Sequence, residues 1–153
     1  LGFEVLELRE GFARIKVPPR PEFVGDVQRP ALHGGLISTL ADSVGGIATF
    51  TKLEKDQRAS TVDMRVDFLR PGNVDMDLIG EGRVLRLGNR VAVAEMRVHQ
   101  GDPEQPIAIG SAVYNEIHLC SEITLIDDHL ARWHMQVCHT CSELRASLLR
   151  EIV

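Results

Sequence analysis

The sequence lacks the features that would point to a membrane, a nucleic acid or an oxidising compartment. Its 153 residues include three cysteines, an odd number that provides no disulfide framework. No apolar run approaches the roughly 20 residues needed to span a bilayer, and residues 1–4 do not resemble a signal peptide. The net charge of −5 comes without a basic block, which argues against nucleic-acid binding. We therefore expect a cytoplasmic protein with no membrane or nucleic-acid partner; because the sequence does not start with methionine, we also expect it to begin inside a longer reading frame.

A stretch that follows two glycines has the pattern of an amphipathic helix. After His33-Gly34-Gly35 the apolar residues recur at three- and four-residue steps, at Leu36, Ile37, Leu40, Ala41, Val44, Ile47 and Ala48. This spacing predicts a helix over about Gly34–Phe50 with one buried side. The Gly45-Gly46 pair inside it costs roughly 1 kcal/mol per residue relative to alanine, which indicates that another backbone packs closely there.

Most of the remaining sequence up to residue 117 alternates as strands do. Two short strands are expected within residues 3–17, followed by an irregular stretch that reaches Leu32. Longer strands are expected at residues 61–69, 74–87, 90–99 and 107–117. The first of them places Val62, Met64, Val66 and Phe68 on one face. One helix followed by a meander of antiparallel strands predicts an α+β domain over residues 1–117, with a curved antiparallel sheet wrapped around one long central helix.

Residues 118–153 do not continue the strand pattern and are expected to form a helical C-terminal extension. They contain Cys138-His139-Thr140-Cys141, with His129 and His134 nearby, and four such ligands can hold zinc. There is no second CxxC, and a single helix would splay these side chains apart. We therefore expect free thiols, with no metal and no cofactor.

The same helix carries a candidate pair of reacting groups. Asp42 falls on or near the buried side, where a carboxylate is costly unless it is paired, solvated or used in chemistry. Gly34 lies eight residues earlier, a little over two turns, so that both residues can face one cleft. The glycine amide can polarise a carbonyl group, and the carboxylate can attack it or activate water. A carboxylate that is merely hydrogen-bonded at a helix interface is the alternative.

Two segments together resemble a known family. His33-Gly34-Gly35 with Leu40-Ala41-Asp42, followed by Thr61-Val62-Asp63-Met64 and Phe68-Leu69-Arg70-Pro71-Gly72, is similar to the hotdog-fold thioesterases of the phenylacetate-degradation type. The resemblance covers about residues 3–117. It implies hydrolysis of acyl-coenzyme A, in a homodimer joined sheet edge to sheet edge or in a homotetramer, with active sites between protomers.

The resemblance also implies roles for individual residues. Asp42 matches the nucleophile or general base, and the Gly34 N–H matches the donor to the thioester carbonyl. Thr61 matches a hydroxyl that helps to place water from the facing protomer. His33 matches the histidine of the motif, which borders the thioester or fixes the loop.

The substrate-binding residues that the resemblance implies lie mostly in loops and turns. Gly35 belongs to the glycine turn, while Arg70, Arg86 and Arg90 lie at strand ends, where coenzyme A phosphates bind in this family. Many members carry an asparagine six residues before the histidine, where this sequence has Val27. The adjacent Gln28 is a candidate substitute. A non-catalytic acyl-CoA-binding module and a hotdog dehydratase or hydratase remain as alternative functions.

Overall fold

The computed structural model describes residues 1–26, 28, 30–54 and 57–118. The chain divides into the units Leu1–Ile117 and His118–Val153, and the helix belongs to the first unit. Val27 and, in the expected C-terminal extension, Cys120, His129, His134, Cys138, His139 and Cys141 lie outside the described residues.

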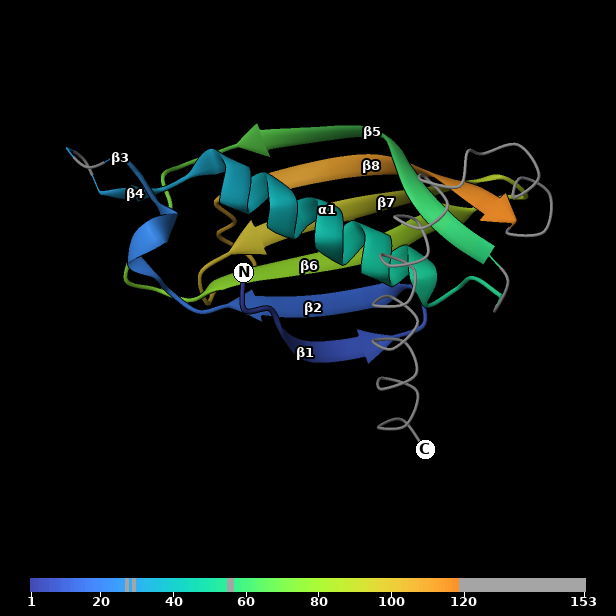
Figure 1. Cartoon of the computed structure of the whole chain (residues 1–153), viewed down its shortest axis with the longest axis horizontal. Coiled ribbons are helices and arrows are strands. Elements are labelled where there is room, and N and C mark those ends of the chain that lie inside the picture. The colour runs from blue at the N-terminus through green and yellow to red at the C-terminus, as the bar shows by residue number, and fades with distance from the viewer. Residues whose placement is uncertain (27, 29, 55–56, 119–153) are drawn as a thin grey trace, which may run out of the picture. The chain divides into compact units, whose positions relative to one another are not determined.

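One long helix packs on one face of a six-stranded sheet (Figure 1). The elements of this layer pair are β1 (Glu4–Arg9), β2 (Phe12–Val17), α1 (Gly34–Phe50), β5 (Gln57–Phe68), β6 (Leu78–Leu87), β7 (Val91–His99) and β8 (Ala108–His118). The strands lie in the order β1-β2-β6-β7-β8-β5, which leaves β1 and β5 at the edges. This arrangement confirms the predicted α+β fold with a central helix.

The helix begins and buries its side chains where the sequence predicts. His33 caps α1, since its Nδ1 accepts a hydrogen bond from the Gly35 N–H at 2.9 Å. Leu40, Val44 and Ala48 are completely buried against the sheet, whereas Ile47 is only half-buried. The three- and four-residue spacing therefore identified the buried side of the helix correctly.

The close backbone approach expected at the glycine pair occurs at Gly45. A Cβ atom on Gly82 of β6 would collide with the carbonyl group of Val44 and would lie 2.8 Å from the Gly45 nitrogen. A Cβ on Gly45 would itself collide with the Tyr114 hydroxyl. Gly46 is less crowded, because the nearest atom to its would-be Cβ is a ring carbon of Tyr114 at 3.7 Å. Glycines on both elements thus let the helix lie directly on the sheet backbone.

Two segments differ from the prediction. The stretch expected to be irregular up to Leu32 contains a 3-10 turn (Pro21–Phe23) and a small hairpin of β3 (Val24–Asp26) and β4 (Ala31–Leu32). The strand expected from Val74 starts only at Leu78. The four residues before it form a turn, because the Asn73 side chain accepts from the Asp75 N–H at 2.9 Å and the Gln100 amide donates to the Asn73 and Met76 carbonyls.

The alternation along β5 is interrupted. Met64 and Val66 pack against the core, but Val62, which was predicted on the same face, is 66% exposed. Instead Thr61 lies against the helix, three residues before Met64. The simple two-residue period therefore does not hold between these positions, and it is Thr61 that reaches α1.

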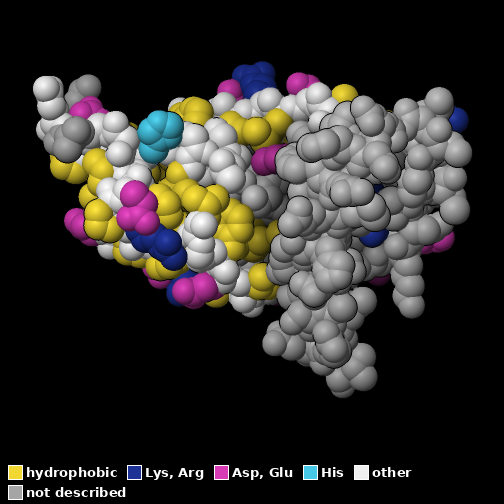
Figure 2. Space-filling model, in the orientation of Figure 1, with side chains coloured by type: hydrophobic (Ala, Val, Ile, Leu, Met, Phe, Trp, Pro, Cys, Tyr) yellow, Lys and Arg dark blue, Asp and Glu magenta, His cyan; other side chains and the backbone are white. Residues whose placement is uncertain are grey.

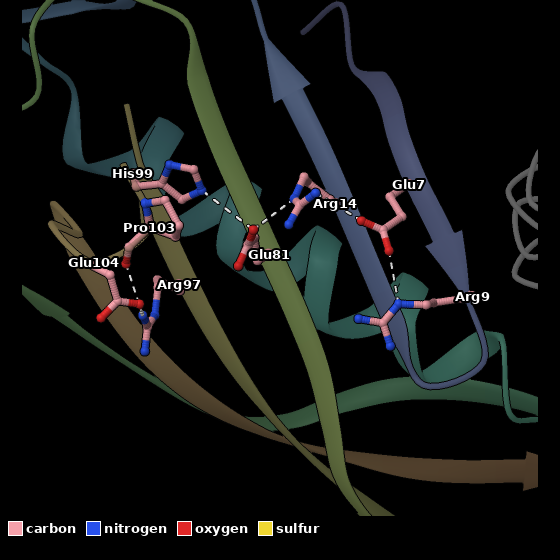
Figure 3. Close-up of polar contacts among 8 residues, drawn as sticks. All are labelled: Glu7, Arg9, Arg14, Glu81, Arg97, His99, Pro103 and Glu104. Carbon is pink, nitrogen blue, oxygen red and sulfur yellow. Dashed lines mark hydrogen bonds and ion pairs between the residues drawn. The ribbon is translucent and has the colours of Figure 1, made fainter. Parts of the chain in front are cut away.

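The face of the sheet opposite the helix carries a chain of charged groups around a buried histidine (Figure 3). Arg14 of β2 donates to Glu7 at 2.8 Å and to Glu81 of β6 at 2.7 Å, and Glu7 also accepts from Arg9. The Nε2 of His99 lies 3.7 Å from a Glu81 oxygen. The His99 side chain is almost fully buried, and neither ring nitrogen has a hydrogen-bond partner among the described residues.

Candidate active site

Asp42 occupies the middle of α1 and is held by hydroxyl groups from two strands. The Thr61 hydroxyl, on the edge strand β5, donates to its Oδ1 at 2.9 Å. The Tyr114 hydroxyl, on β8, lies 3.1 Å from the Asp42 main-chain carbonyl oxygen and 3.4 Å from the same Oδ1. No described residue hydrogen-bonds Oδ2 or forms an ion pair with this half-buried carboxylate. One carboxylate oxygen is therefore occupied, and the other is available for chemistry.

Thr61 joins the site in a different way from the one expected. The resemblance implied a hydroxyl that comes from a facing protomer, but the structure places Thr61 on the Asp42 of its own chain. The reason is the interrupted alternation of β5, which turns Thr61 rather than Val62 toward the helix. The contact ties the edge strand to the helix at the level of the carboxylate.

Tyr114 is the site residue that the sequence analysis missed. Its side chain is 1% exposed and belongs to the hydrophobic core. Burial raises the pKa of the Tyr114 hydroxyl well above its ordinary value, and the neighbouring Asp42 carboxylate adds to the increase. The hydroxyl therefore stays protonated and acts as a donor at neutral pH. The sequence feature that could have pointed to it is that Tyr114 is the only tyrosine of the chain and lies in the last predicted strand. A tyrosine in a strand is, however, also typical of an ordinary hydrophobic core.

The glycine turn at the start of α1 contains one amide that no described residue accepts from. The His33 side chain takes the Gly35 N–H, and the His33 carbonyl takes those of Leu36 and Ile37. No described residue accepts from the Gly34 N–H, which lies at the positive end of the helix dipole. A free amide in this position can donate to an oxyanion. His33 acts here as a helix cap, and this contact fixes the turn.

Phe68 forms a wall beside that amide. A Cβ on Gly34 would lie 3.4 Å from the Phe68 ring, so the ring covers the start of the helix. The Phe68 side chain is still 53% exposed, and the adjoining Leu69 is exposed to a similar extent. Figure 2, in the orientation of Figure 1, shows hydrophobic side chains gathered around the first half of the helix. An apolar surface thus adjoins the free amide.

The candidate phosphate-binding arginines do not come together in one chain. Arg70 follows β5 at the end where α1 begins, and it donates to the Gln105 side chain at 3.2 Å. Arg86 and Arg90 flank the β6–β7 turn, near the end of α1. Both are exposed. The three arginines therefore lie at opposite ends of the helix.

Gln28 lies in the loop between β3 and β4, outside the contacts of the site. Its side chain is exposed and makes no hydrogen bond to His33, Gly34 or Asp42, whereas its main-chain N–H donates to Asp26 at 2.9 Å.

The described residues contain no group of three or more side chains able to hold a metal ion. No helix within the described part of the chain is long and apolar enough to cross a bilayer.

The chain is similar to known thioesterases in sequence and in fold. Residues 30–107 match the family model of the Thioesterase superfamily. The medium/long-chain acyl-CoA thioesterase YigI of Salmonella typhimurium is 34% identical over 127 residues, which cover 74% of this chain and 81% of YigI.

Solved structures show the same fold. The thioesterase HI1161 of Haemophilus influenzae superposes with a TM-score of 0.72 at 20% identity, covering 80% of this chain and 83% of its own. A mutant of the phenylacetic acid degradation protein PaaI of Thermus thermophilus superposes with a TM-score of 0.66 at 24% identity. The superposition covers 75% of this chain and 93% of the PaaI chain. At these identities the superpositions establish the hotdog fold, and the sequence matches establish the family. The chain therefore belongs to the thioesterase superfamily, as a thioesterase of the hotdog fold.

Proposed function

We propose that this thioesterase hydrolyses acyl-coenzyme A to a free acid and coenzyme A, with Asp42 as the reacting carboxylate. The observation that carries the proposal is the state of this side chain: Oδ1 is held by Thr61 and Tyr114, and no described residue bonds Oδ2. Such a carboxylate can attack a thioester carbonyl or deprotonate water. The relative YigI, named for medium- and long-chain acyl-CoA, supports this substrate class and makes those chain lengths the first to test.

The proposal includes a second chain, because one chain holds its two reacting groups too far apart. Eight residues separate Gly34 from Asp42, which is about 12 Å along a helix. A donor about 3 Å from the carbonyl oxygen and a nucleophile about 3–3.5 Å from the carbon cannot be that distant from each other. A two-fold copy with an antiparallel helix would bring Gly34 of one chain to Asp42 of the other.

The edge strand β5 supports such a pairing. In the described sheet it is the last strand, next to β8, and it spans the twelve residues Gln57–Phe68. Val62, Phe68 and Leu69 expose more than half of their surface. A long edge with exposed apolar side chains favours association with another strand. We therefore propose a homodimer joined through β5.

In this arrangement the Gly34 N–H of one chain polarises the thioester carbonyl, and the helix dipole strengthens the interaction. Asp42 of the other chain then attacks the carbonyl carbon, or it deprotonates a water molecule that Thr61 helps to place. Antiparallel helices also bring the start of one beside the end of the other. Arg70 of one chain can then share a coenzyme A molecule with Arg86 or Arg90 of the second, as contacts to its phosphates.

The test is a hydrolysis assay with acyl-CoA substrates that carry short, medium-length, long or aryl acyl groups. The reaction is monitored through the free thiol of the coenzyme A that is released. The wild-type chain is expected to turn over at least one class, and Asp42→Asn is expected to lose about a hundredfold or more in kcat. Tight binding without turnover would support the non-catalytic module instead, and turnover of enoyl-CoA alone would support a hydratase. An acyl mass increment on the enzyme during turnover would distinguish direct attack from general-base catalysis.

A further inference from the structure

Asp42 receives a contact from the interior of the protein as well as from its surface. Thr61 approaches from the exposed edge strand, while Tyr114 approaches from beneath the helix, through the core. A buried hydroxyl is costly unless it finds an acceptor. Among the described residues, the acceptors of the Tyr114 hydroxyl are two oxygens of Asp42, the main-chain carbonyl and Oδ1.

We propose that Tyr114 is a positioning residue for the carboxylate of Asp42, an inference that rests on the proposed role of Asp42 in hydrolysis. Its hydroxyl bridges the main chain and the side chain of one residue, and this limits rotation of the carboxylate about its side-chain bonds. Thr61, on the neighbouring strand β5, holds the same Oδ1. Together the two hydroxyls present Oδ2 for the reaction in a fixed orientation.

Gly45 makes this contact possible. A Cβ at this position would collide with the Tyr114 hydroxyl and would lie 3.1 Å from the Met96 sulfur. Glycine in a helix interior costs roughly 1 kcal/mol relative to alanine, and here that cost has a function. The absent side chain provides the space through which the tyrosine reaches the helix. Gly45, Tyr114 and Asp42 therefore act as one unit.

The polar contacts of the Asp42 carboxylate are few. Thr61 of β5 and Tyr114 of β8 donate to its Oδ1, and no described cation lies within ion-pair distance. Tyr114 stays protonated because burial raises the pKa of its hydroxyl. Tyr114→Phe therefore removes one donor from the carboxylate, while Thr61 still holds Oδ1.

The first experiment compares Tyr114→Phe with the wild-type enzyme. We expect kcat to fall about tenfold while KM stays within about twofold, because the lost contact orients the carboxylate and does not touch substrate. Met96→Leu is the matched control: it alters a neighbouring side chain beneath Gly45 without touching Asp42, and it should leave both readouts unchanged.

A double-mutant cycle separates positioning from packing. Gly45→Ala should lower activity strongly in the wild-type background, where the new methyl group meets the Tyr114 hydroxyl. In the Tyr114→Phe background the hydroxyl is gone, so the same change should cost much less. Equal losses in the two backgrounds, or a Tyr114→Phe enzyme with wild-type kcat, would overturn the inference.

A readout that needs no activity keeps this inference separate from the proposed function. The carbon-13 chemical shift of the Asp42 carboxylate reports its hydrogen bonding and can be compared at one fixed pH in the folded wild-type, Tyr114→Phe and Met96→Leu proteins. We expect this chemical shift to change only in Tyr114→Phe, which loses the contact to Oδ1. If the wild type hydrolyses no acyl-CoA, the proposed function fails while this comparison still tests Tyr114. An unchanged chemical shift in Tyr114→Phe would contradict the role of Tyr114 alone.

Discussion

Gly82 of β6 lies directly against the backbone of Val44 in α1, so that no side chain fits between helix and sheet at this point. Gly80, two residues earlier, faces the side chains of Leu40 and Val44 in a similar way. The helix is thereby seated on the sheet within two turns of Asp42. Changes on the inner face of β6 should therefore alter the stability of the whole domain.

The first prediction concerns the contact between Gly82 and the helix. Gly82→Ala places a methyl group against the Val44 carbonyl. Because a backbone group cannot change rotamer as a side chain can, the helix has to move away from the sheet. We expect a loss of about 2–4 kcal/mol in the free energy of unfolding, measured by urea denaturation. Gly46→Ala is the matched control, because its new methyl group has room. That variant should gain about 0.5–1 kcal/mol from helix propensity, and similar losses in both variants would contradict the explanation.

The second prediction isolates the Gly34 amide. Proline is well tolerated at the first position of a helix and removes only the N–H, and the extended conformation of His33, with φ −64° and ψ 128°, suits a following proline. Gly34→Pro should lower kcat about 100- to 1000-fold, as expected for the loss of an oxyanion donor. Gly34→Ala keeps the N–H and meets the Phe68 ring only at 3.4 Å, so it should lose far less. If both variants lose activity equally, shape rather than the amide is responsible.

The third prediction tests whether two chains build one site. Gly34→Pro and Asp42→Asn are each expected to be nearly inactive. In a mixed dimer one of the two sites combines the intact Gly34 of one chain with the intact Asp42 of the other. If equal amounts of the two variants are mixed and their chains re-pair at random, half of the dimers are mixed, and each mixed dimer has one intact site of two. The mixture should therefore recover about a quarter of the wild-type activity. A mixture no more active than its components would place both groups in the same chain.

The fourth prediction concerns stability and pH at His99. Burial lowers the pKa of His99 below its ordinary value of 6.5, against the opposing effect of the Glu81 carboxylate, while Arg14 adds to the decrease and Asp102 opposes it. As the pH falls through that ordinary value, the unfolded chain binds a proton that the folded chain still excludes. The free energy of unfolding should then decrease by up to about 1.4 kcal/mol per pH unit for this one proton.

Replacing His99 should remove this dependence. His99→Gln keeps a polar side chain of similar length but has no proton to bind near neutral pH. Urea denaturation of both proteins between pH 8 and pH 5.5 is expected to show a smaller decrease in the variant. An identical pH dependence would assign the effect to other groups.

The fold was largely predictable because its signals are local. The helix over Gly34–Phe50 follows from apolar periodicity and from a glycine turn, and the β6–β7 turn follows from Gly88-Asn89. The late start of β6 was not predictable in this way, because it depends on Gln100, a residue from a distant loop. The same holds for the interrupted alternation of β5, which depends on how the edge strand meets the helix.

The candidate site was predictable in part for the same reason. Asp42 and the Gly34 amide lie on one helix, and their spacing is visible in the sequence. Tyr114 was not recognised, because an inward-facing tyrosine in a strand does not reveal which helix residue lies above its hydroxyl. Arg70, Arg86 and Arg90 lie at strand ends as predicted, but they lie at opposite ends of the helix, and only the proposed pairing of two chains would bring them together.

The position of β5 at the edge of the described sheet also bears on how this protein behaves during purification and engineering. A long edge strand with exposed apolar residues is a template for any extended segment, including that of a misfolded chain. A substitution that blunts the edge, such as Val62→Lys, would improve solubility, and under the proposed pairing it would also separate the two halves of each site. Solubility and turnover would then be opposing objectives in any directed-evolution experiment on this chain.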